Sequence, residues 1–159
     1  MIRKAELQDI SRIAEIIVFG KRVAYRPIFS NDIVSFNELQ VMNLVEEYRS
    51  NLSIIENMIV YDDGIMKGVI NRKFVDEDVE VCEFYVEPFF KRKGIGRELI
   101  QHVISEAKMT HKRRIFLWVI KDNLLARKFY EANGFKENGQ TCLIEGTDKI
   151  DMCYELRLF

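Results

Sequence analysis

Residues 79–99 read VEVCEFYVEPFFKRKGIGREL, and the expected fold is built outward from this stretch. It begins with β-branched and aromatic residues that favour a strand. Pro88 ends that strand because proline has no N–H for a ladder hydrogen bond. A basic turn with two glycines follows at 91–96, and from Arg97 onward apolar residues recur at helical spacing. The stretch therefore predicts a strand, a glycine loop and a helix in succession.

This succession directs unpaired backbone N–H groups and the positive end of a helix dipole at one place, which makes an anion site. Gly94 has no side chain, so a ligand can approach its backbone closely, and basic residues flank it. The alternative is that Gly94 and Gly96 only make a tight strand-to-helix turn. Neither GxxxxGK[ST] nor GxGxxG occurs here, which excludes the usual nucleotide-hydrolase and dinucleotide loops.

The glycine loop resembles motif A of the GNAT superfamily of N-acetyltransferases, in which Gln or Arg precedes two residues, Gly, any residue, and Gly or Ala. Here the motif reads Lys91-Arg92-Lys93-Gly94-Ile95-Gly96, after a Tyr-Val-x-Pro sequence at 85–88. Lys91 replaces the usual Arg or Gln, and Arg92 stands where many members have a first Gly. Both departures keep or add positive charge.

A second segment resembles motif B of the same family. Residues 123–135 read NLLARKFYEANGF, which matches an Asn followed by Ala, then Phe-Tyr-Glu, then Gly-Phe. An apolar run ending in Trp118-Val119-Ile120 precedes it and predicts a strand. The two motifs stand in the family's order and separation, and together they cover residues 79–135.

The resemblance implies one α/β domain over residues 1–159, with a mixed, mostly antiparallel central sheet flanked by helices. Two central strands of such a fold splay apart to admit CoA, here between Tyr85-Val86 and Trp118-Val119. The implied activity is acetyl-CoA-dependent transfer of an acetyl group to a primary amine of a small molecule or peptide, by direct attack. Acetyl-CoA is then a co-substrate, and no metal is implied.

The resemblance also implies which residues bind acetyl-CoA. Backbone groups of Tyr85 and Val86 receive the pantetheine arm in the manner of an added strand. Asn123 matches the family's cofactor-contacting asparagine, although Asn is also a common helix N-cap, and both roles are compatible. Arg127 falls on the same helix face, where a solvated cation is favoured over a phosphate contact. The pyrophosphate is expected on Lys91, Arg92, Lys93, Gly94, Ile95, Gly96 and Arg97.

Three groups are implied in the chemistry. Tyr130 matches the family's general-acid tyrosine, the alternative being a core tyrosine that bonds backbone. The N–H of Val86 is expected to polarise the thioester carbonyl. Glu80 occupies the position where some members place a catalytic base, and Glu83 lies on the opposite strand face. The alternative for Glu80 is an exposed strand acid, with a water relay removing the proton.

Composition limits the remaining classes of function. The chain has 159 residues, a formal net charge of −1 and no apolar run long enough to span a membrane, so neither nucleic acid nor a membrane is an expected partner. Three cysteines and two histidines lack ligand spacing, which argues against structural zinc and for reduced thiols in a cytoplasmic protein. A homodimer is compatible with the sequence.

The rest of the chain predicts interspersed helices and strands. Apolar spacing predicts helices at 8–19, ending at Gly20, and at 38–49, separated by a break at Arg26-Pro27 and a loop at 29–36. Short apolar runs predict the strands. These are 1–4 at an edge, 58–61 and 65–75 as a hairpin around Asp63-Gly64, 115–120 buried on both faces, and 141–145 paired with 150–158.

No signature fixes the acceptor. Residues 21–49 are expected to wall its pocket. Acids at 76–78, Glu80 and Glu83 favour a cationic acceptor, whereas a solvated acidic turn also explains the first three. Two rival classes are a non-catalytic CoA-binding module and a nucleic-acid-binding domain that uses the basic runs 91–93 and 111–114. The net charge opposes the second.

Overall fold

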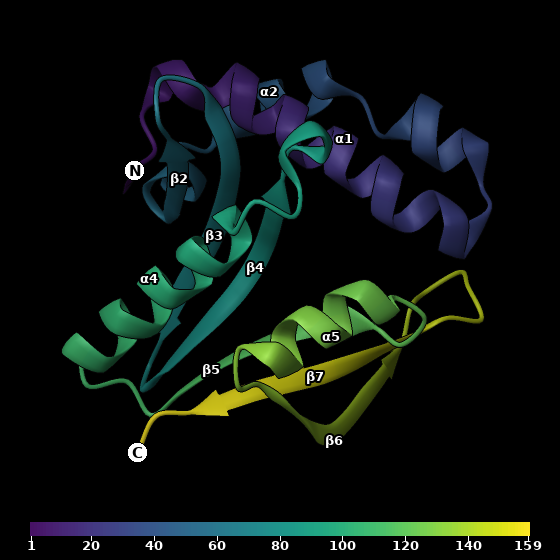
Figure 1. The fold of residues 1–159 in the computed structure, drawn as a ribbon. Coiled ribbons are helices and arrows are strands. Elements are labelled where there is room, and N and C mark those ends of the chain that lie inside the picture. The colour runs from purple at the N-terminus through teal and green to yellow at the C-terminus, as the bar shows by residue number, and fades with distance from the viewer. The chain divides into compact units, whose positions relative to one another are not determined.

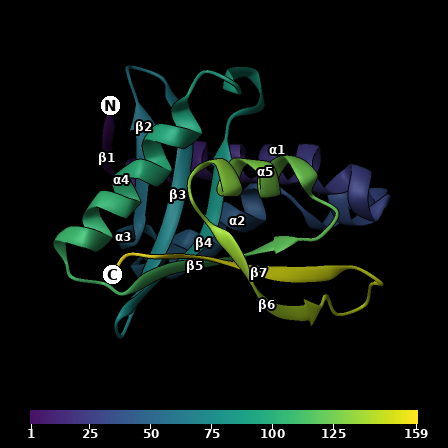
Figure 2. The same cartoon turned by 60° about the horizontal axis from the view of Figure 1, so that its bottom comes forward.

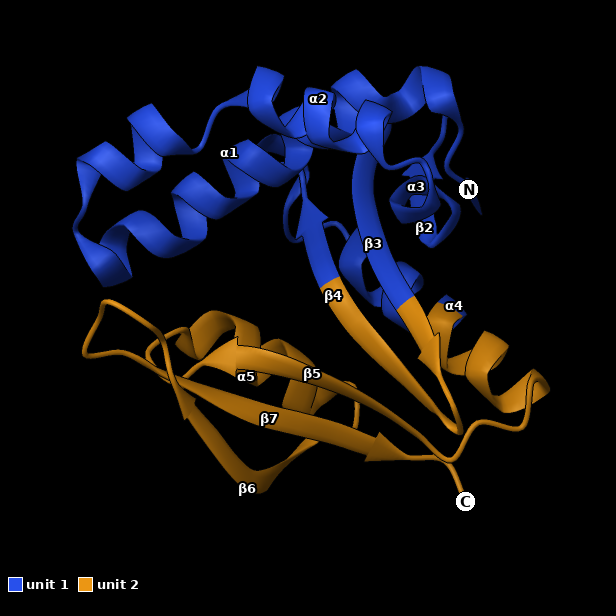
Figure 3. Cartoon of the chain, turned by 180° about the vertical axis from the view of Figure 1, so that it is seen from behind, with its two compact units in different colours: residues 1–72, 83–102 blue, residues 73–82, 103–159 orange.

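The computed structural model describes every residue, Met1–Phe159, and the chain forms two compact units (Figure 3). Unit 1 comprises residues 1–72 and 83–102, and unit 2 comprises residues 73–82 and 103–159. Figure 1 labels the larger elements. In chain order they are β1 (Ile2–Lys4), η1 (Leu7–Asp9), α1 (Ile10–Phe29), η2 (Ile33–Glu38), α2 (Val41–Ser50), α3 (Ser53–Glu56), β2 (Met58–Asp62), β3 (Met66–Val75), β4 (Asp78–Val86), η3 (Pro88–Phe90), α4 (Ile95–Met109), β5 (Arg114–Ile120), α5 (Leu124–Ala132), β6 (Lys136–Leu143) and β7 (Ile150–Arg157).

Seven strands form one mixed sheet in the order β1-β2-β3-β4-β5-β7-β6. β4 and β5 are parallel, whereas β1–β2, β2–β3, β5–β7 and β6–β7 are antiparallel. The parallel ladder ends at Val81↔Leu117, while β4 continues to Val86. The expected α/β class, with a mixed and mostly antiparallel sheet flanked by helices, is confirmed. Tyr85-Val86 and Trp118-Val119, where the splay is expected, lie beyond that ladder.

The core of unit 1 forms where the apolar faces of α1 and α2 meet β2 and β3. Ile13, Ile17, Val60 and Val69 are fully buried in one cluster. Gly68 is next to Val69 on the strand and so points to the opposite face, where an added Cβ would lie 2.9 Å from Cδ1 of Leu99 on α4. The helices α1 and α2 therefore cover one face of these strands, and the first turns of α4 cover the other.

The helix α1 is longer than the sequence predicts. It does not stop at Gly20 or break at Arg26-Pro27, but runs to Phe29 and ends at Ser30, whose φ is 50°. Gly20 is required for close packing, because a Cβ there would stand 2.6 Å from Cδ1 of Tyr85. Pro27 lies in the last turn, and the helix still closes after it, since the N–H of Ser30 donates to the carbonyl of Arg26 at 2.9 Å.

Two neighbouring boundaries also differ from the prediction. The segment 29–36, expected to be a loop, contains the start of the π-helical turn η2 at Ile33. The helix α4 begins at Ile95, inside the glycine motif, and not at Arg97. The turn η2 is a separate element within the expected loop, and the helix predicted at 38–49 is present as α2 from Val41. At α4 only the start of the predicted helix differs.

In unit 2, α5 lies over one face of β5 and β7 (Figure 2). Leu117 on β5 and Tyr154 on β7 are register partners and are buried on this face. Trp118 points to the other face and is 40% exposed. The prediction that the β5 strand is buried on both faces is therefore wrong, because only one face of it is fully covered.

β6 is the outermost strand at its end of the sheet. The antiparallel pairing of the closing strands is confirmed, but β6 starts at Lys136, earlier than predicted. Its register with β7 shifts between Glu137 and Thr141, and Gly139 within this interval has a φ of 87°. The strand is thus bulged in the middle.

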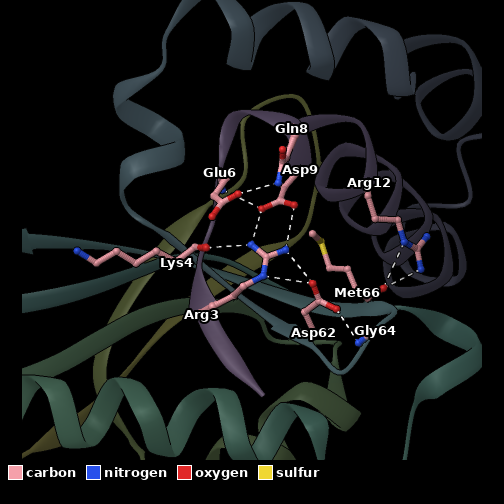
Figure 4. Close-up of polar contacts among 9 residues, drawn as sticks. All are labelled: Arg3, Lys4, Glu6, Gln8, Asp9, Arg12, Asp62, Gly64 and Met66. Carbon is pink, nitrogen blue, oxygen red and sulfur yellow. Dashed lines mark hydrogen bonds and ion pairs between the residues drawn. The ribbon is translucent and has the colours of Figure 1, made fainter.

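A polar network joins the N-terminal segment to β2 in unit 1 (Figure 4). Arg3 donates from Nη1 to Oδ2 of Asp9 at 2.7 Å and from Nη2 to Oδ2 of Asp62 at 2.8 Å. Asp62 also accepts the N–H of Gly64 at 3.0 Å, which shapes the hairpin turn. The hydrogen bonds from Arg3 hold the pKa of both carboxyl groups below their usual range.

Candidate active site

The glycine loop lies in unit 1 between η3 and α4. Lys91, Arg92, Lys93 and Gly94 are all exposed. Arg92 has a φ of 62° and Gly94 has a φ of 82°, so two alternating residues are in the left-handed region. A Cβ added to Gly94 would meet no protein atom within 4 Å. The space above this turn is therefore open to a ligand.

The first turn of α4 supplies donors to the same place. The first backbone hydrogen bond of this helix runs from the N–H of Glu98 to the carbonyl of Gly94 at 3.0 Å. The N–H groups of Ile95, Gly96 and Arg97 precede it and have no partner within the helix. With the exposed basic side chains of the loop, these donors fit the oxygens of a diphosphate.

Two contacts from β3 and α1 anchor the chain just before the loop. Glu87 is a buried carboxylate, 4% exposed, which accepts a hydrogen bond from Nη1 of Arg12 at 3.0 Å. The N–H of Glu87 donates to the carbonyl of Lys67 at 2.8 Å. Arg12 also donates to the carbonyl of Met66. Sequence reasoning missed this anchor because Arg12 and Glu87 are far apart in the chain.

The end of β4 presents its backbone groups in two directions. The N–H of Glu87 faces β3, and N–H groups of successive strand residues point to alternate edges, so the N–H of Val86 faces away from β3. Tyr85 directs its side chain to α1, where its ring packs on Gly20 and its hydroxyl lies 2.8 Å from that of Tyr25. Val86 is thus the better placed of the two residues for an external partner.

Glu83 is engaged by a cation of the chain itself. Its Oε1 lies 3.1 Å from Nζ of Lys21 on α1, and both side chains are about three-quarters buried. The buried phenol of Tyr48 is nearby, and burial, aided by Glu83, raises the pKa of that phenol. Glu83 therefore holds α1 against β4 within unit 1.

Asn123 begins α5 in unit 2. Its Oδ1 accepts a hydrogen bond from the N–H of Ala126 at 3.2 Å, so the N-cap role that the sequence left open is present. The turn before it is also tied down, since the N–H of Lys121 donates to the carbonyl of Ile150 at 2.8 Å. The amide Nδ2 of Asn123 is left for other contacts by this capping geometry.

Tyr130 follows Asn123 by seven positions, about two turns along α5. Its ring makes edge-to-face contacts with Phe129 at 5.4 Å and with Phe135 at 5.8 Å between centroids. Phe135 is 1% exposed, which gives the tyrosine ring a fixed apolar support. The expectation that Arg127 is a solvated cation is wrong: its Nε donates to the hydroxyl of Tyr154 at 3.0 Å.

Glu80 lies on the sheet face opposite α5 in unit 2. Its register partner is Phe116, whose own partner on β7 is Glu155, and residues paired in this way share a face. Tyr154, next to Glu155, points to the other face and contacts α5. Glu80 and the helix that carries Tyr130 therefore approach this part of the sheet from opposite sides.

The predicted site residues divide between the two units. Those in unit 1 are Tyr85, Val86 and the run 91–97, which forms the loop 91–94 and the first residues of α4. Those in unit 2 are Glu80, Asn123 and Tyr130.

The basic run 111–114 and the acidic turn 76–78 neutralise one another in unit 2. Arg113 contacts Glu77 at 2.7 Å, and Arg114 contacts Asp78 at 2.9 Å. Lys112 donates to a backbone carbonyl of the same turn. The basic run 111–114 is thus paired with the acidic turn 76–78, so less of its positive charge is available to nucleic acid. This weakens the rival hypothesis of a nucleic-acid-binding domain.

Comparison with known proteins identifies the family of the chain. A family model described as "Acetyltransferase (GNAT) family" matches residues 26–135, well over half of the chain. The chain belongs to the GNAT acetyltransferase family.

Individual relatives agree with this assignment. A spermidine N(1)-acetyltransferase of Thermoplasma acidophilum is 25% identical over 97% of this chain and 94% of its own length. The PaiA N-acetyltransferase of T. acidophilum, solved with coenzyme A, superposes with a TM-score of 0.76 at 21% identity, over 99% of this chain and 98% of that one. The ribosomal-protein-S18-alanine N-acetyltransferase of Escherichia coli has a TM-score of 0.73 at 21% identity, over 99% and 92%. None of the helices combines the length and apolar character needed to cross a bilayer.

Proposed function

We propose that this protein is an N-acetyltransferase that transfers the acetyl group of acetyl-CoA to a primary amine of a small molecule or peptide by direct attack. The observation that carries the proposal is the exposed, left-handed turn at 91–94 that leads into the N-terminus of α4 in a member of the GNAT family. The structural neighbour solved with coenzyme A supports the choice of donor.

Acetyl-CoA is held by two sets of groups in this proposal. The run 91–97 binds the pyrophosphate through backbone N–H groups and basic side chains. Val86, whose N–H points away from β3, receives the pantetheine arm, and Tyr85 contributes by fixing this end of β4 against α1. The Oδ1 of Asn123 caps α5, and its side-chain amide N–H groups donate to acetyl-CoA.

The transfer itself needs a base, an oxyanion donor and an acid. Glu80 or a water that it orders takes a proton from the acceptor ammonium, and the neutral amine nitrogen then bonds to the acetyl carbon. The N–H of Val86 stabilises the charge that develops on the carbonyl oxygen. The C–S bond breaks, and the leaving thiolate takes the phenol proton of Tyr130. Since a thiol has a pKa of about 8.5, this last proton assists without being indispensable.

The acceptor tested first should be a polyamine. The relative named as a spermidine acetyltransferase matches nearly the whole chain. A [ribosomal protein bS18]-alanine N-acetyltransferase of Salmonella typhimurium is 33% identical over 48% of the chain and supports a peptide N-terminus as the second class. The acids of the sequence add less than expected, since Glu77, Asp78 and Glu83 are already paired with cations of the chain.

The test measures release of the CoA thiol from acetyl-CoA with spermidine, aminoglycosides and a peptide that begins with alanine. We expect release that depends on one amine class, with mass spectrometry showing the acetylated acceptor. Tyr130→Phe should lower turnover by roughly tenfold or more and leave the affinity for acetyl-CoA unchanged. If acetyl-CoA binds but no amine accelerates thiol release, the protein is a CoA-binding module and the proposal is wrong.

A further inference from the structure

The helix α5 carries the proposed site residue Tyr130 and is capped by another, Asn123, but it has little apolar anchorage. It spans only nine residues, and none of them is fully buried. Helices this short are marginal in water unless other parts of the protein hold them. Apolar contact also constrains the rotation and axial position of a helix loosely, because it has no preferred direction. Directional polar contacts can therefore fix the rotation of α5 on the sheet more closely than its apolar contacts do.

Those contacts converge on one buried phenol. Tyr154 on β7 is 0% exposed, and its hydroxyl accepts a hydrogen bond from Nε of Arg127 at 3.0 Å. The same hydroxyl donates to Oε1 of Glu131 at 2.9 Å. Arg127 and Glu131 are one helical turn apart, so both contacts come from one stripe of α5. A tyrosine phenol is protonated at neutral pH and can donate, and burial raises the pKa of Tyr154 further above its ordinary value.

Arg127 extends this arrangement to the turn before the helix. Its Nη1 donates to the carbonyl of Lys121 at 2.9 Å, two residues before Asn123. A single guanidinium therefore connects the β7 phenol, the helix and the turn that presents the Asn123 amide. Tyr130 stands in the chain between Arg127 and Glu131, so a shift or rotation of this turn moves its hydroxyl.

We propose that Tyr154, Arg127 and Glu131 form a clamp that positions Tyr130, and through Lys121 also Asn123, for acetyl transfer. This inference rests on the proposed function. The three members of the clamp are positioning residues, since they act through Tyr130 and Asn123. Displacement of a reacting group by about 1 Å can cost on the order of 100-fold in rate, so loss of the clamp affects turnover far more than its effect on folding suggests.

The test compares Tyr154→Phe, which keeps the ring and removes both hydrogen bonds, with Tyr61→Phe, which removes a half-buried phenol on β2 in unit 1. We expect Tyr154→Phe to lower kcat by about tenfold or more while the KM for the amine changes by less than about twofold. Hydrogen exchange should accelerate in the amides of α5. The Tyr61→Phe variant should keep the kcat of the wild type.

A double mutant separates positioning from a general loss of stability. If Tyr154 acts through Tyr130, adding Tyr154→Phe to Tyr130→Phe should lower kcat by less than about twofold further, because the group being positioned is already gone. Arg127→Gln tests the clamp at a second member, which is partly exposed. It should lower kcat in the same way and weaken CoA binding several-fold, since it also releases the Lys121 carbonyl.

The outcomes distinguish this inference from the proposed function. Wild-type kcat and unchanged α5 exchange in Tyr154→Phe would overturn the clamp and leave the acetyltransferase proposal intact. An equal loss of kcat on adding Tyr154→Phe to either background would show that the phenol only supports the fold, which also overturns the clamp. A wild-type protein that acetylates no amine would overturn the proposed function. In that case, hydrogen exchange of the α5 amides in Tyr154→Phe would still show whether the Tyr154 hydroxyl holds this helix.

Discussion

At the scale of single residues, Gly94 shows how backbone conformation and ligand access combine. Its φ of 82° disfavours any residue with a Cβ, yet the space that a Cβ would occupy is open. Gly64 in the β2–β3 hairpin has the same two properties, with a φ of 104° and no protein atom within 4 Å of an added Cβ. The two glycines therefore share a positive φ and open space, but a ligand is expected only above Gly94.

Gly94→Val should weaken binding of CoA by about tenfold or more, because the side chain enters the space proposed for the pyrophosphate. It should also cost roughly 1–2 kcal/mol of folding free energy for the left-handed conformation. Titration calorimetry with CoA and urea unfolding measure the two effects. Gly64→Val is the matched control, with a similar loss of stability and wild-type affinity. Equal affinity in both variants would contradict the placement of the diphosphate.

At the scale of elements, α1 departs most from expectation. A glycine followed by a proline a few residues later ordinarily marks the end of a helix. Here Gly20 faces the ring of Tyr85, and the ring cannot swing away freely because its hydroxyl bonds that of Tyr25. The requirement for glycine comes from a contact 65 positions away in the chain, which no local pattern reveals.

Gly20→Ala should therefore destabilise the protein, although the same change in an open helix is stabilising by about 1 kcal/mol. Overpacking against the Tyr85 ring should lower the free energy of unfolding by about 1–3 kcal/mol. Ser11→Ala, at an exposed position of α1, should change it by less than about 0.5 kcal/mol. Chemical denaturation measures both, and a more stable Gly20→Ala variant would refute the close contact.

The elements that the sequence predicts well are those with local signals. The β2–β3 hairpin, the strand β4 and the helix α4 follow from alternation, Pro88 and the glycine loop, and the run 91–97 follows from its match to motif A. What could not be predicted depends on partners distant in sequence: the Arg12–Glu87 anchor, the pairing of the acidic turn with the basic run, and the contacts of Arg127 with Tyr154. The sequence alone does not show whether a charged residue on a helix is solvated or paired, because its partner can lie far away in the chain.

At the scale of the whole molecule, stability should depend on pH through the Arg3 network. Hydrogen bonds from Arg3 lower the pKa of Asp9 and of Asp62 in the folded state. A lowered folded pKa means that the stabilisation is complete above the unfolded value, about 4, and is lost as the pH falls through the lower folded values.

Arg3→Met should lower the free energy of unfolding at pH 7 by about 1–3 kcal/mol, because the buried Asp9 loses its charged donor. The difference from the wild type should shrink as the pH falls below 4 and both carboxyl groups become protonated. Urea unfolding over a pH series measures it. Arg26→Met breaks the exposed pair with Asp32 and should leave the stability unchanged. A gap between Arg3→Met and the wild type that does not vary with pH would exclude this role.

The bulge in β6 has a consequence for behaviour at high concentration. A free outer strand offers a template on which further copies can stack into fibrils. In β6 the backbone turns at Gly139, so its amides and carbonyls do not form the straight, evenly spaced row that such stacking requires. We therefore expect the kink at Gly139 to oppose strand-to-strand stacking at this edge of the sheet.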